Sequence, residues 1–174
     1  QQMGFRNELD ELIAAAKADG HIDDLACFVR PGVVVMQWTD DRDDPQWEIY
    51  QEAYDILRST RDARGRELEV HKLPQPTVLE WTAEEAEGLD HIDGTHVREA
   101  GTKICASYIN YYCGNSAIVL PLFNDPKDGE ARDILAGLFP KHRIIGIENS
   151  REILLGGGNV ACITMPQYAA PVKN

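Results

Sequence analysis

The same order of strand-like and helix-like segments occurs twice along this chain, and that internal repeat restricts the folds open to it. In the first copy, apolar segments at Leu25–Val29 and Val33–Trp38 are joined by the turn residues Pro31–Gly32. An amphipathic helix of about 18 residues is expected from Pro45, followed by a strand at Glu67–Leu73. The pattern predicts a β-β-α-β unit.

The second copy begins at Ile104 and has the same order of segments. It predicts, in turn, strand Ile104–Tyr112, strand Ala117–Phe123, helix Lys127–Leu138 and strand Arg143–Glu148. Apolar segments at Ile153–Leu155 and Val160–Thr164 would begin a third copy as strands, without its helix. The predicted fold class is α/β. Because such units bury their core only against neighbours, we expect further copies to come from outside these residues.

Composition narrows the class of protein. The 174 residues are 43% hydrophobic, which is enough for one compact unit. The formal net charge of −12 argues against a nucleic-acid partner, since phosphate affinity needs clustered lysine and arginine. Such a charge attracts small cations, and it is also typical of an acidic surface that keeps a protein soluble. Without a membrane-length apolar run or a targeting pattern, we expect a soluble, cytoplasmic protein.

The cysteines stand singly, with no C-x-x-C pair and no histidine at metal-ligand spacing. This predicts reduced thiols and no metal site. We interpret Cys27, Cys105 and Cys113 as small core hydrophobes. Cys162 differs from them because glycines precede it.

Two short motifs are candidates for chemistry. Gly156–Gly158 lie between two apolar segments and let the chain turn tightly or approach a ligand, which would present Cys162 to a pocket. The alternative is a glycine-rich hairpin with a buried cysteine. His21 and Asp23 stand two residues apart, so an extended chain would place both side chains on one face, as a proton shuttle and a cation ligand. The alternative is an exposed loop.

A long polar connector, Pro74 to Glu99, separates the repeats. It carries a possible short helix at Ala83–Gly88, and we expect it to form a surface insertion near the mouth of an active site. His91 and Asp93 repeat the His-x-Asp spacing, but no strand follows them, so we do not expect them to be catalytic. The segment Asn7–Ala18 is helix-like.

Several motifs together resemble the agmatine deiminases of the guanidine-modifying, or pentein, superfamily. They stand in the family's order and spacing at Asp19 to Trp38, Asp62 to Arg66, Ala100 to Lys103, Ser107 to Asn110 and Gly146 to Thr164. The resemblance implies a five-bladed α/β propeller of β-β-α-β modules, of which residues 1–174 would hold about two and a fraction, as the C-terminal portion of a single catalytic domain. It also implies a likeness to bacterial-type peptidylarginine deiminases.

The resemblance implies roles for individual residues. Cys162 would attack the guanidinium carbon, His21 would shuttle protons, and Asp23 would hold the guanidinium nitrogens. Asn110 would lie near the pocket, with Gly157 and Gly158 at the substrate. A nucleophilic role further predicts that the pKa of Cys162 is depressed or that substrate readily activates the thiol.

The implied reaction is hydrolysis of agmatine to N-carbamoylputrescine and ammonia, a step of putrescine and polyamine biosynthesis, through a covalent thiouronium and without a metal or organic cofactor. The alternatives are a peptidylarginine deiminase and a non-catalytic pentein fragment or subunit.

The chain departs from the family at three positions, because relatives usually have His where Ala161 stands and Gln-Gln where Met165 and Pro166 stand. The family's other guanidinium-binding acids belong to its N-terminal half and have no counterpart in this chain. We therefore expect a missing half or a second chain as partner, in a homo-oligomeric enzyme.

Overall fold

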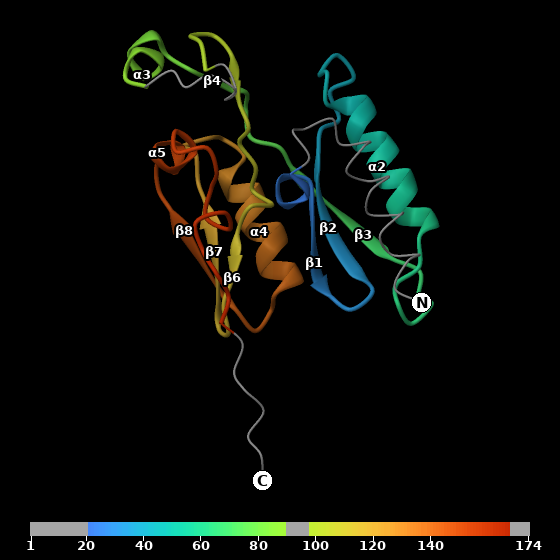
Figure 1. Cartoon of the computed structure of the whole chain (residues 1–174). Helices are drawn as coiled ribbons and strands as arrows, with labels where there is room; N and C mark the ends of the chain where they lie inside the picture. The colour runs from blue at the N-terminus through green and yellow to red at the C-terminus, as the bar shows by residue number, and fades with distance from the viewer. Residues whose placement is uncertain (1–20, 90–97, 168–174) are drawn as a thin grey trace.

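A computed structural model describes residues 21–89 and 98–167 of this chain (Figure 1). The helix-like segment Asn7–Ala18 and the second His-x-Asp pair, His91 and Asp93, lie outside the described residues. The described part is α/β, as the repeat predicts, with short sheets and helices in alternation. Within those residues, no helix is both long and apolar enough to cross a membrane.

The first repeat forms a three-stranded sheet with one covering helix. Strand β1 (Ala26–Arg30) is antiparallel to β2 (Val33–Trp38), and β2 is parallel to β3 (Glu69–Pro74). Helix α2 (Trp47–Ser59) connects β2 to β3 and packs on both strands (Figure 1). The helix has 13 residues rather than the roughly 18 predicted, because Pro45 and Gln46 form a turn before it and the chain becomes extended at Thr60.

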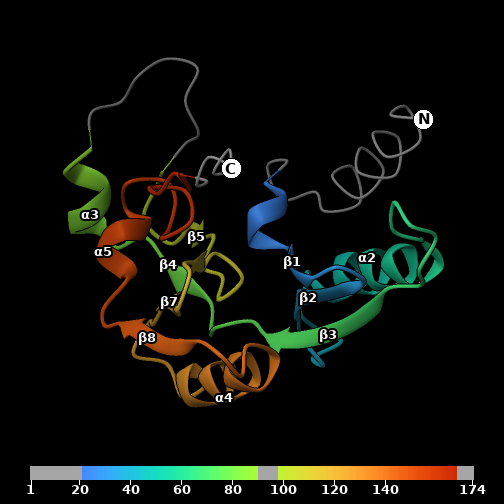
Figure 2. The same cartoon turned by 90° about the horizontal axis from the view of Figure 1, so that it is seen from below.

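The second repeat has the same topology. Strand β6 (Tyr112–Cys113) is antiparallel to β7 (Ala117–Pro121), and β7 is parallel to β8 (Arg143–Ile147). Helix α4 (Asp128–Leu138) connects β7 to β8, packs on β8 and also contacts β3 of the first repeat (Figure 2). The predicted internal repeat is therefore confirmed, and α4 joins the two units.

The predicted strand Ile104–Tyr112 is wrong. Ile104 lies in the two-residue strand β5 (Lys103–Ile104), which pairs with β4 (Leu79–Glu80) of the connector, and Tyr112 begins the separate strand β6. Residues 105–111 instead turn through the interior. The hydroxyl of Ser107 accepts a hydrogen bond from the Ile109 amide, a local bond that competes with strand pairing.

The predicted third pair of strands is also wrong. Arg151–Leu154 forms a short helix, α5, where a strand was expected at Ile153–Leu155. Residues 160–164 do not form a strand, since the Ile163 and Thr164 amides donate hydrogen bonds to the nearby carbonyls of Asn159 and Ala161. Apolar residues alone could not distinguish these short turns from buried strands.

Strand β2 lies at the centre of the core and is buried along its whole length. On one face, Val34 and Met36 pack with the apolar stripe of α2, which includes Ala53 and Leu57. On the other face, Val35 joins the core of the second repeat. A strand covered on both faces reads as a continuous apolar run, as Val33–Trp38 does.

The connector folds partly on its own. Thr82 and Glu85 form a capping box at the start of α3 (Ala83–Glu87), which confirms the predicted short helix. Arg151 at the start of α5 donates two hydrogen bonds to the Glu85 carboxylate and one to the Glu80 carbonyl. Helices α3 and α5 consequently lie side by side (Figures 1 and 2).

The interpretation of the cysteines as core residues is wrong for Cys105 and Cys113, whereas Cys27 packs against the core of the second repeat. Cys105 and Cys113 are exposed, and Cys27 is only half-buried. Cys113 lies on the two-residue strand β6, and Cys105 lies in the irregular segment that replaces the predicted strand.

Candidate active site

His21 and Asp23 lie at the entrance to the first sheet. The prediction of an extended chain is wrong here, because residues Ile22–Asp24 form a single 3-10 turn, η1. The turn still brings the His21 ring close to Asp23, with Nδ1 3.8 Å from Oδ1. The side chains are 61% and 41% exposed, so both can meet a ligand.

The glycine segment places Cys162 in a tight loop after α5. Gly157 has a φ of +94°, a conformation that favours glycine. A Cβ atom on Gly158 would lie 2.6 Å from the Cys162 Cβ and 3.1 Å from its Sγ. Because Gly158 has no Cβ, it leaves room for the Cys162 side chain.

The two motifs meet in the structure although 139 residues separate them in sequence. The Cys162 Sγ lies 3.1 Å from the Asp23 Oδ2, at hydrogen-bond distance. Each motif had a simpler interpretation on its own, as an exposed loop or a hairpin with a buried cysteine. Cys162 is exposed, and the contact brings a thiol, a carboxylate and an imidazole into one small region.

Asn110 is the fully buried centre of this region. Its amide nitrogen lies 3.0 Å from an oxygen of Asp23, 3.0 Å from an oxygen of Asp24 and 3.1 Å from the Cys162 sulfur. Its amide oxygen accepts hydrogen bonds from the backbone of Ala161 and Cys162 at 2.8 and 3.4 Å. Asn110 thus joins the η1 turn to the cysteine loop, beneath the exposed thiol.

The electrostatics of Cys162 differ from one expectation. The pKa of the thiol is raised, chiefly by desolvation and further by its hydrogen bond to the Asp23 carboxylate. The prediction of a depressed thiol pKa is therefore wrong for the ligand-free site. Its alternative, activation of the thiol by a cationic substrate, stays a prediction.

Sequence reasoning missed Asp24. Burial, followed by the charge of Asp23, raises its pKa from 3.8 to about 6. Its side chain accepts a hydrogen bond from Asn110, and its carbonyl accepts one from the Ser107 hydroxyl at 2.8 Å. The only signal in the sequence was the pair of adjacent acids, which are common on exposed surfaces.

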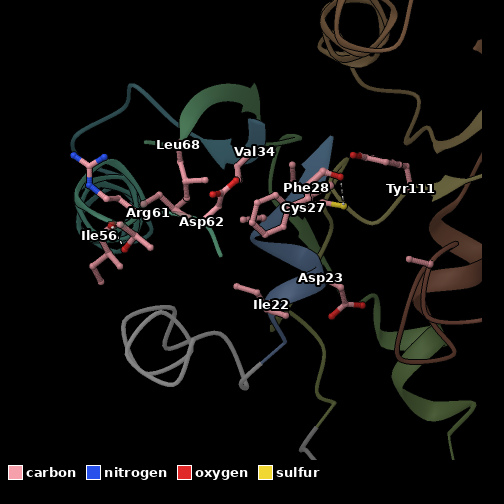
Figure 3. Close-up of a pocket in the computed structure, with 15 residues that line it drawn as sticks. Ile22, Asp23, Cys27, Phe28, Val34, Ile56, Arg61, Asp62, Leu68 and Tyr111 are labelled. Atoms are coloured by element: carbon pink, nitrogen blue, oxygen red, sulfur yellow. Dashed lines mark hydrogen bonds between the residues drawn. The ribbon is translucent and has the colours of Figure 1, made fainter. Parts of the chain in front are cut away.

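A cavity of about 480 Å³ opens beside the cysteine loop (Figure 3). Asp23 and Ala161 are among its lining residues, and Figure 3 shows Asp23 on the side of the cavity opposite Arg61 and Asp62. Its walls are mostly apolar and include the ring of Phe28, which is 52% exposed.

The connector reaches the cysteine loop through Arg98. Its guanidinium donates a hydrogen bond to the Leu155 carbonyl at 3.4 Å and lies over the Trp81 ring. The same group would meet a Cβ atom on Gly157 at 2.9 Å. This end of the connector therefore lies against the glycine segment.

Comparison with known proteins decides the family. The family model of the Porphyromonas-type peptidyl-arginine deiminases matches residues 8–167. The chain belongs to that family. This confirms the likeness to the bacterial-type deiminases that its motifs predict.

Among curated members, the chain is 51% identical over 148 residues to the putative agmatine deiminase 2 of Listeria monocytogenes, covering 85% of this chain and 40% of that protein. It is 48% identical over 157 residues to the agmatine deiminase of Pseudomonas putida strain F1, covering 90% and 42%. The chain therefore spans about two fifths of the length of these family members.

A solved agmatine deiminase of Enterococcus faecalis superposes with a TM-score of 0.76 at 36% identity, over 87% of this chain and 41% of that one. A putative arginine deiminase of Porphyromonas gingivalis superposes with a TM-score of 0.69 at 26% identity, over 87% and 39%. The family's fold is thus shared by this chain.

Proposed function

We propose that this chain carries the nucleophile and the proton shuttle of an agmatine deiminase, which hydrolyses agmatine to N-carbamoylputrescine and ammonia. The observation that carries the proposal is the 3.1 Å contact between the Cys162 sulfur and the Asp23 carboxylate, in a chain about half identical to agmatine deiminases. A carboxylate beside a thiol suits a cationic guanidinium, which it can hold against the sulfur.

The raised pKa of Cys162 fits activation by the substrate. In the ligand-free site the thiol can donate its hydrogen to Asp23. An arriving guanidinium would take over the Asp23 carboxylate, and its positive charge would favour the thiolate. The proton leaves to His21, whose ring lies beside Asp23.

The thiolate then adds to the guanidinium carbon and forms a carbon–sulfur bond. His21, as the imidazolium, protonates one nitrogen, the carbon–nitrogen bond breaks, and ammonia leaves with a thiouronium on Cys162. Neutral His21 next takes a proton from water, whose oxygen attacks the same carbon and releases the ureido product and the thiol. No metal or organic cofactor enters this sequence.

In this proposal, residues 1–174 are one portion of a single five-bladed catalytic domain. The two β-β-α-β copies and the share of family members that the chain spans support it. Ile163 and Met165, directly after the nucleophile, are 68% and 90% exposed, which suits residues that a neighbouring unit covers. The rest of the polypeptide or a second chain would supply the remaining carboxylates, in an enzyme that we also propose to be a homo-oligomer.

A second candidate function is deimination of arginine in a polypeptide, which the name of the matched family favours. The same chemistry at Cys162 would serve both substrates, and the wall facing the far end of the substrate would choose between them.

The test measures ammonia release by the full-length protein with agmatine and with an arginine-containing peptide. We expect turnover of agmatine, and its loss by a factor of at least about 10,000 in Cys162→Ser, since the nucleophile is removed. Cys113→Ser is the matched control, because it makes the same change at another exposed cysteine and should stay active. Turnover of the peptide alone would favour the second candidate, and equal activity in Cys162→Ser would contradict both.

A further inference from the structure

Asn110 has more acceptors around it than hydrogens to give. Its amide nitrogen carries two hydrogens, yet three acceptors lie within 3.1 Å, namely the carboxylates of Asp23 and Asp24 and the sulfur of Cys162. At any moment one of the three lacks a hydrogen from Asn110. The side chain cannot turn to reach other partners, because the backbone amides of the cysteine loop hold its oxygen.

We propose that Asp24 is a positioning residue for Cys162 and acts through the Asn110 carboxamide that both groups contact. While the thiol is protonated, it donates to Asp23, and Asn110 can give its two hydrogens to the two carboxylates. When the sulfur becomes a thiolate, it needs a donor, and Asn110 can serve it only by releasing one carboxylate.

Asp23 and Asp24 differ in what can replace the hydrogen bond from Asn110 when it is lost. Asp23 is 41% exposed and can pair with a bound cation, whereas both carboxylate oxygens of Asp24 already face side chains of this chain, those of Asn110 and Cys105. Protonation of Asp24 weakens it as an acceptor and removes one negative charge close to the sulfur. A neutral Asp24 therefore frees the Asn110 hydrogen for the thiolate, and a charged Asp24 holds it back.

Several ionisable and polar groups surround Asp24. Asp23 and His21 lie on the same turn, and the Cys105 sulfur lies 3.8 Å from the second Asp24 oxygen. Ser107 and Asn110 contact it from the irregular segment that enters β6. Burial and the Asp23 charge raise the pKa of Asp24 to about 6, close to neutrality, so its charge changes within a pH range that the enzyme can meet.

The test follows the ionisation of the Cys162 thiol, measured as the rate of iodoacetamide labelling of the Cys162 peptide against pH in the full-length protein. Asp24→Asn and Asp24→Ser each remove the charge and keep a polar group. We expect both to lower the pH midpoint for Cys162 by about one unit, the usual effect of one nearby charge. Asp133→Asn, an exposed site on α4 with the same change of charge, should leave the midpoint unchanged.

A second readout does not depend on the folding of those variants. In wild-type protein, the logarithm of the Cys162 labelling rate should rise by less than one per pH unit around pH 6, because Asp24 loses its proton there. The His21 ring also lies close to Asp23, so the profile is also recorded in His21→Gln, where the shallow region should persist. A uniform slope in His21→Gln, or an unchanged or higher midpoint in both Asp24 variants, would overturn the proposal.

The positioning role of Asp24 rests on the proposed role of Cys162, and the labelling experiment can fail one without failing the other. A protein without agmatine turnover whose Cys162 midpoint still falls in Asp24→Asn would refute the proposed function and leave the positioning role. An enzyme that turns over agmatine but keeps the wild-type Cys162 midpoint in both Asp24 variants would refute the positioning role and leave the proposed function.

Discussion

The two repeats share their strand order and crossover helix, and they differ just before their first strand. In the first repeat Leu25 directly precedes β1 and packs into the apolar core beside α2. In the second, Asn110 stands two residues before β6, equally buried, and its amide contacts three polar side chains. The segment before the first strand thus packs into the core in one repeat and makes polar contacts at the candidate site in the other.

A buried amide costs free energy unless its hydrogen bonds are made, so the second repeat must provide partners that the first does not need. It shortens β6 to two residues and turns the preceding segment inward. The partners come from η1 and from the cysteine loop. The two repeats share their strands and crossover helix, and the candidate site lies at the segment before β6, where they differ.

The largest effect should come from crowding the cysteine loop while sparing the scaffold. In Gly158→Ala the new Cβ would lie 2.6 Å from the Cys162 Cβ, so the loop must shift. We expect turnover of agmatine by the full-length protein to fall at least about 100-fold, the effect of a small misplacement of a reacting group.

Gly137→Ala on α4 is the matched control, because its Cβ would meet nothing within 4 Å. Alanine in a helix is favoured over glycine by about 0.5 to 1 kcal/mol, so thermal denaturation should show equal or higher stability with activity retained. Equal activity in the two variants would show that the sulfur does not need the space at Gly158.

Asn110→Leu makes the second repeat resemble the first and should reduce turnover by about 10-fold to 100-fold through misplacement of Cys162. The loop amides of Ala161 and Cys162 lose their side-chain acceptor, and Asp23 loses a donor. Asn115→Leu in the exposed turn before β7 is the control. Wild-type kcat and KM in Asn110→Leu would contradict the comparison between the repeats.

These differences show what the sequence could and could not predict. Val33–Trp38 was predicted to the residue because a strand covered on both faces is apolar throughout. Ile104–Tyr112 is as apolar, but its course depends on Ser107 and Asn110 finding partners about 50 to 85 residues away, which no local pattern encodes.

The candidate site divides in the same way. His21, Asp23 and Cys162 were identified from motif resemblance, and the structure brings them together. Asp24 was not identified, because only burial beside a second carboxylate distinguishes it from a surface acid. The raised pKa of Cys162 likewise follows chiefly from desolvation in the folded loop and further from the contact with Asp23, and no local sequence pattern shows either.

The acidic turn should also affect stability. The pKa of Asp24 is about 6 in the fold and 3.8 ordinarily, so the fold holds the proton more tightly. That contribution is complete below the ordinary value and is lost as pH rises through about 6. Between about pH 7.5 and pH 5, the free energy of unfolding should rise by roughly 1 kcal/mol on this account.

Urea denaturation at both pH values measures the change, and Asp24→Asn should remove it. The pKa values of Asp62 and Glu85 are lowered to about 2, so their contributions are present above their ordinary values and are lost only at more acidic pH. They therefore stay constant across this window. The same gain on acidification in Asp24→Asn as in wild type would assign the effect to other groups.

The smallest effect concerns two arginine–glutamate pairs, one beside the first repeat and one between the connector and α5. Arg61 pairs with Glu67 at 2.7 Å beside the first repeat, with side chains 59% and 76% exposed. Arg151 pairs with Glu85 at 2.8 Å, with side chains 25% and 19% exposed, and it also bonds to the Glu80 carbonyl. The second pair holds the connector against α5, next to the cysteine loop.

An exposed ion pair contributes little because water screens it and ordering its side chains costs entropy, so Arg61→Gln should destabilise the protein by about 0.5 kcal/mol or less. Arg151→Gln removes a bidentate, more enclosed pair and leaves the Glu85 carboxylate, 19% exposed, without its donor, at a cost of about 1 kcal/mol. Urea denaturation of both variants at neutral pH measures the difference. If the connector also steadies the cysteine loop, Arg151→Gln should change the labelling rate of Cys162 while Arg61→Gln does not. Equal stabilities and equal labelling rates would show that the connector is fastened to the site no more firmly than a surface ion pair.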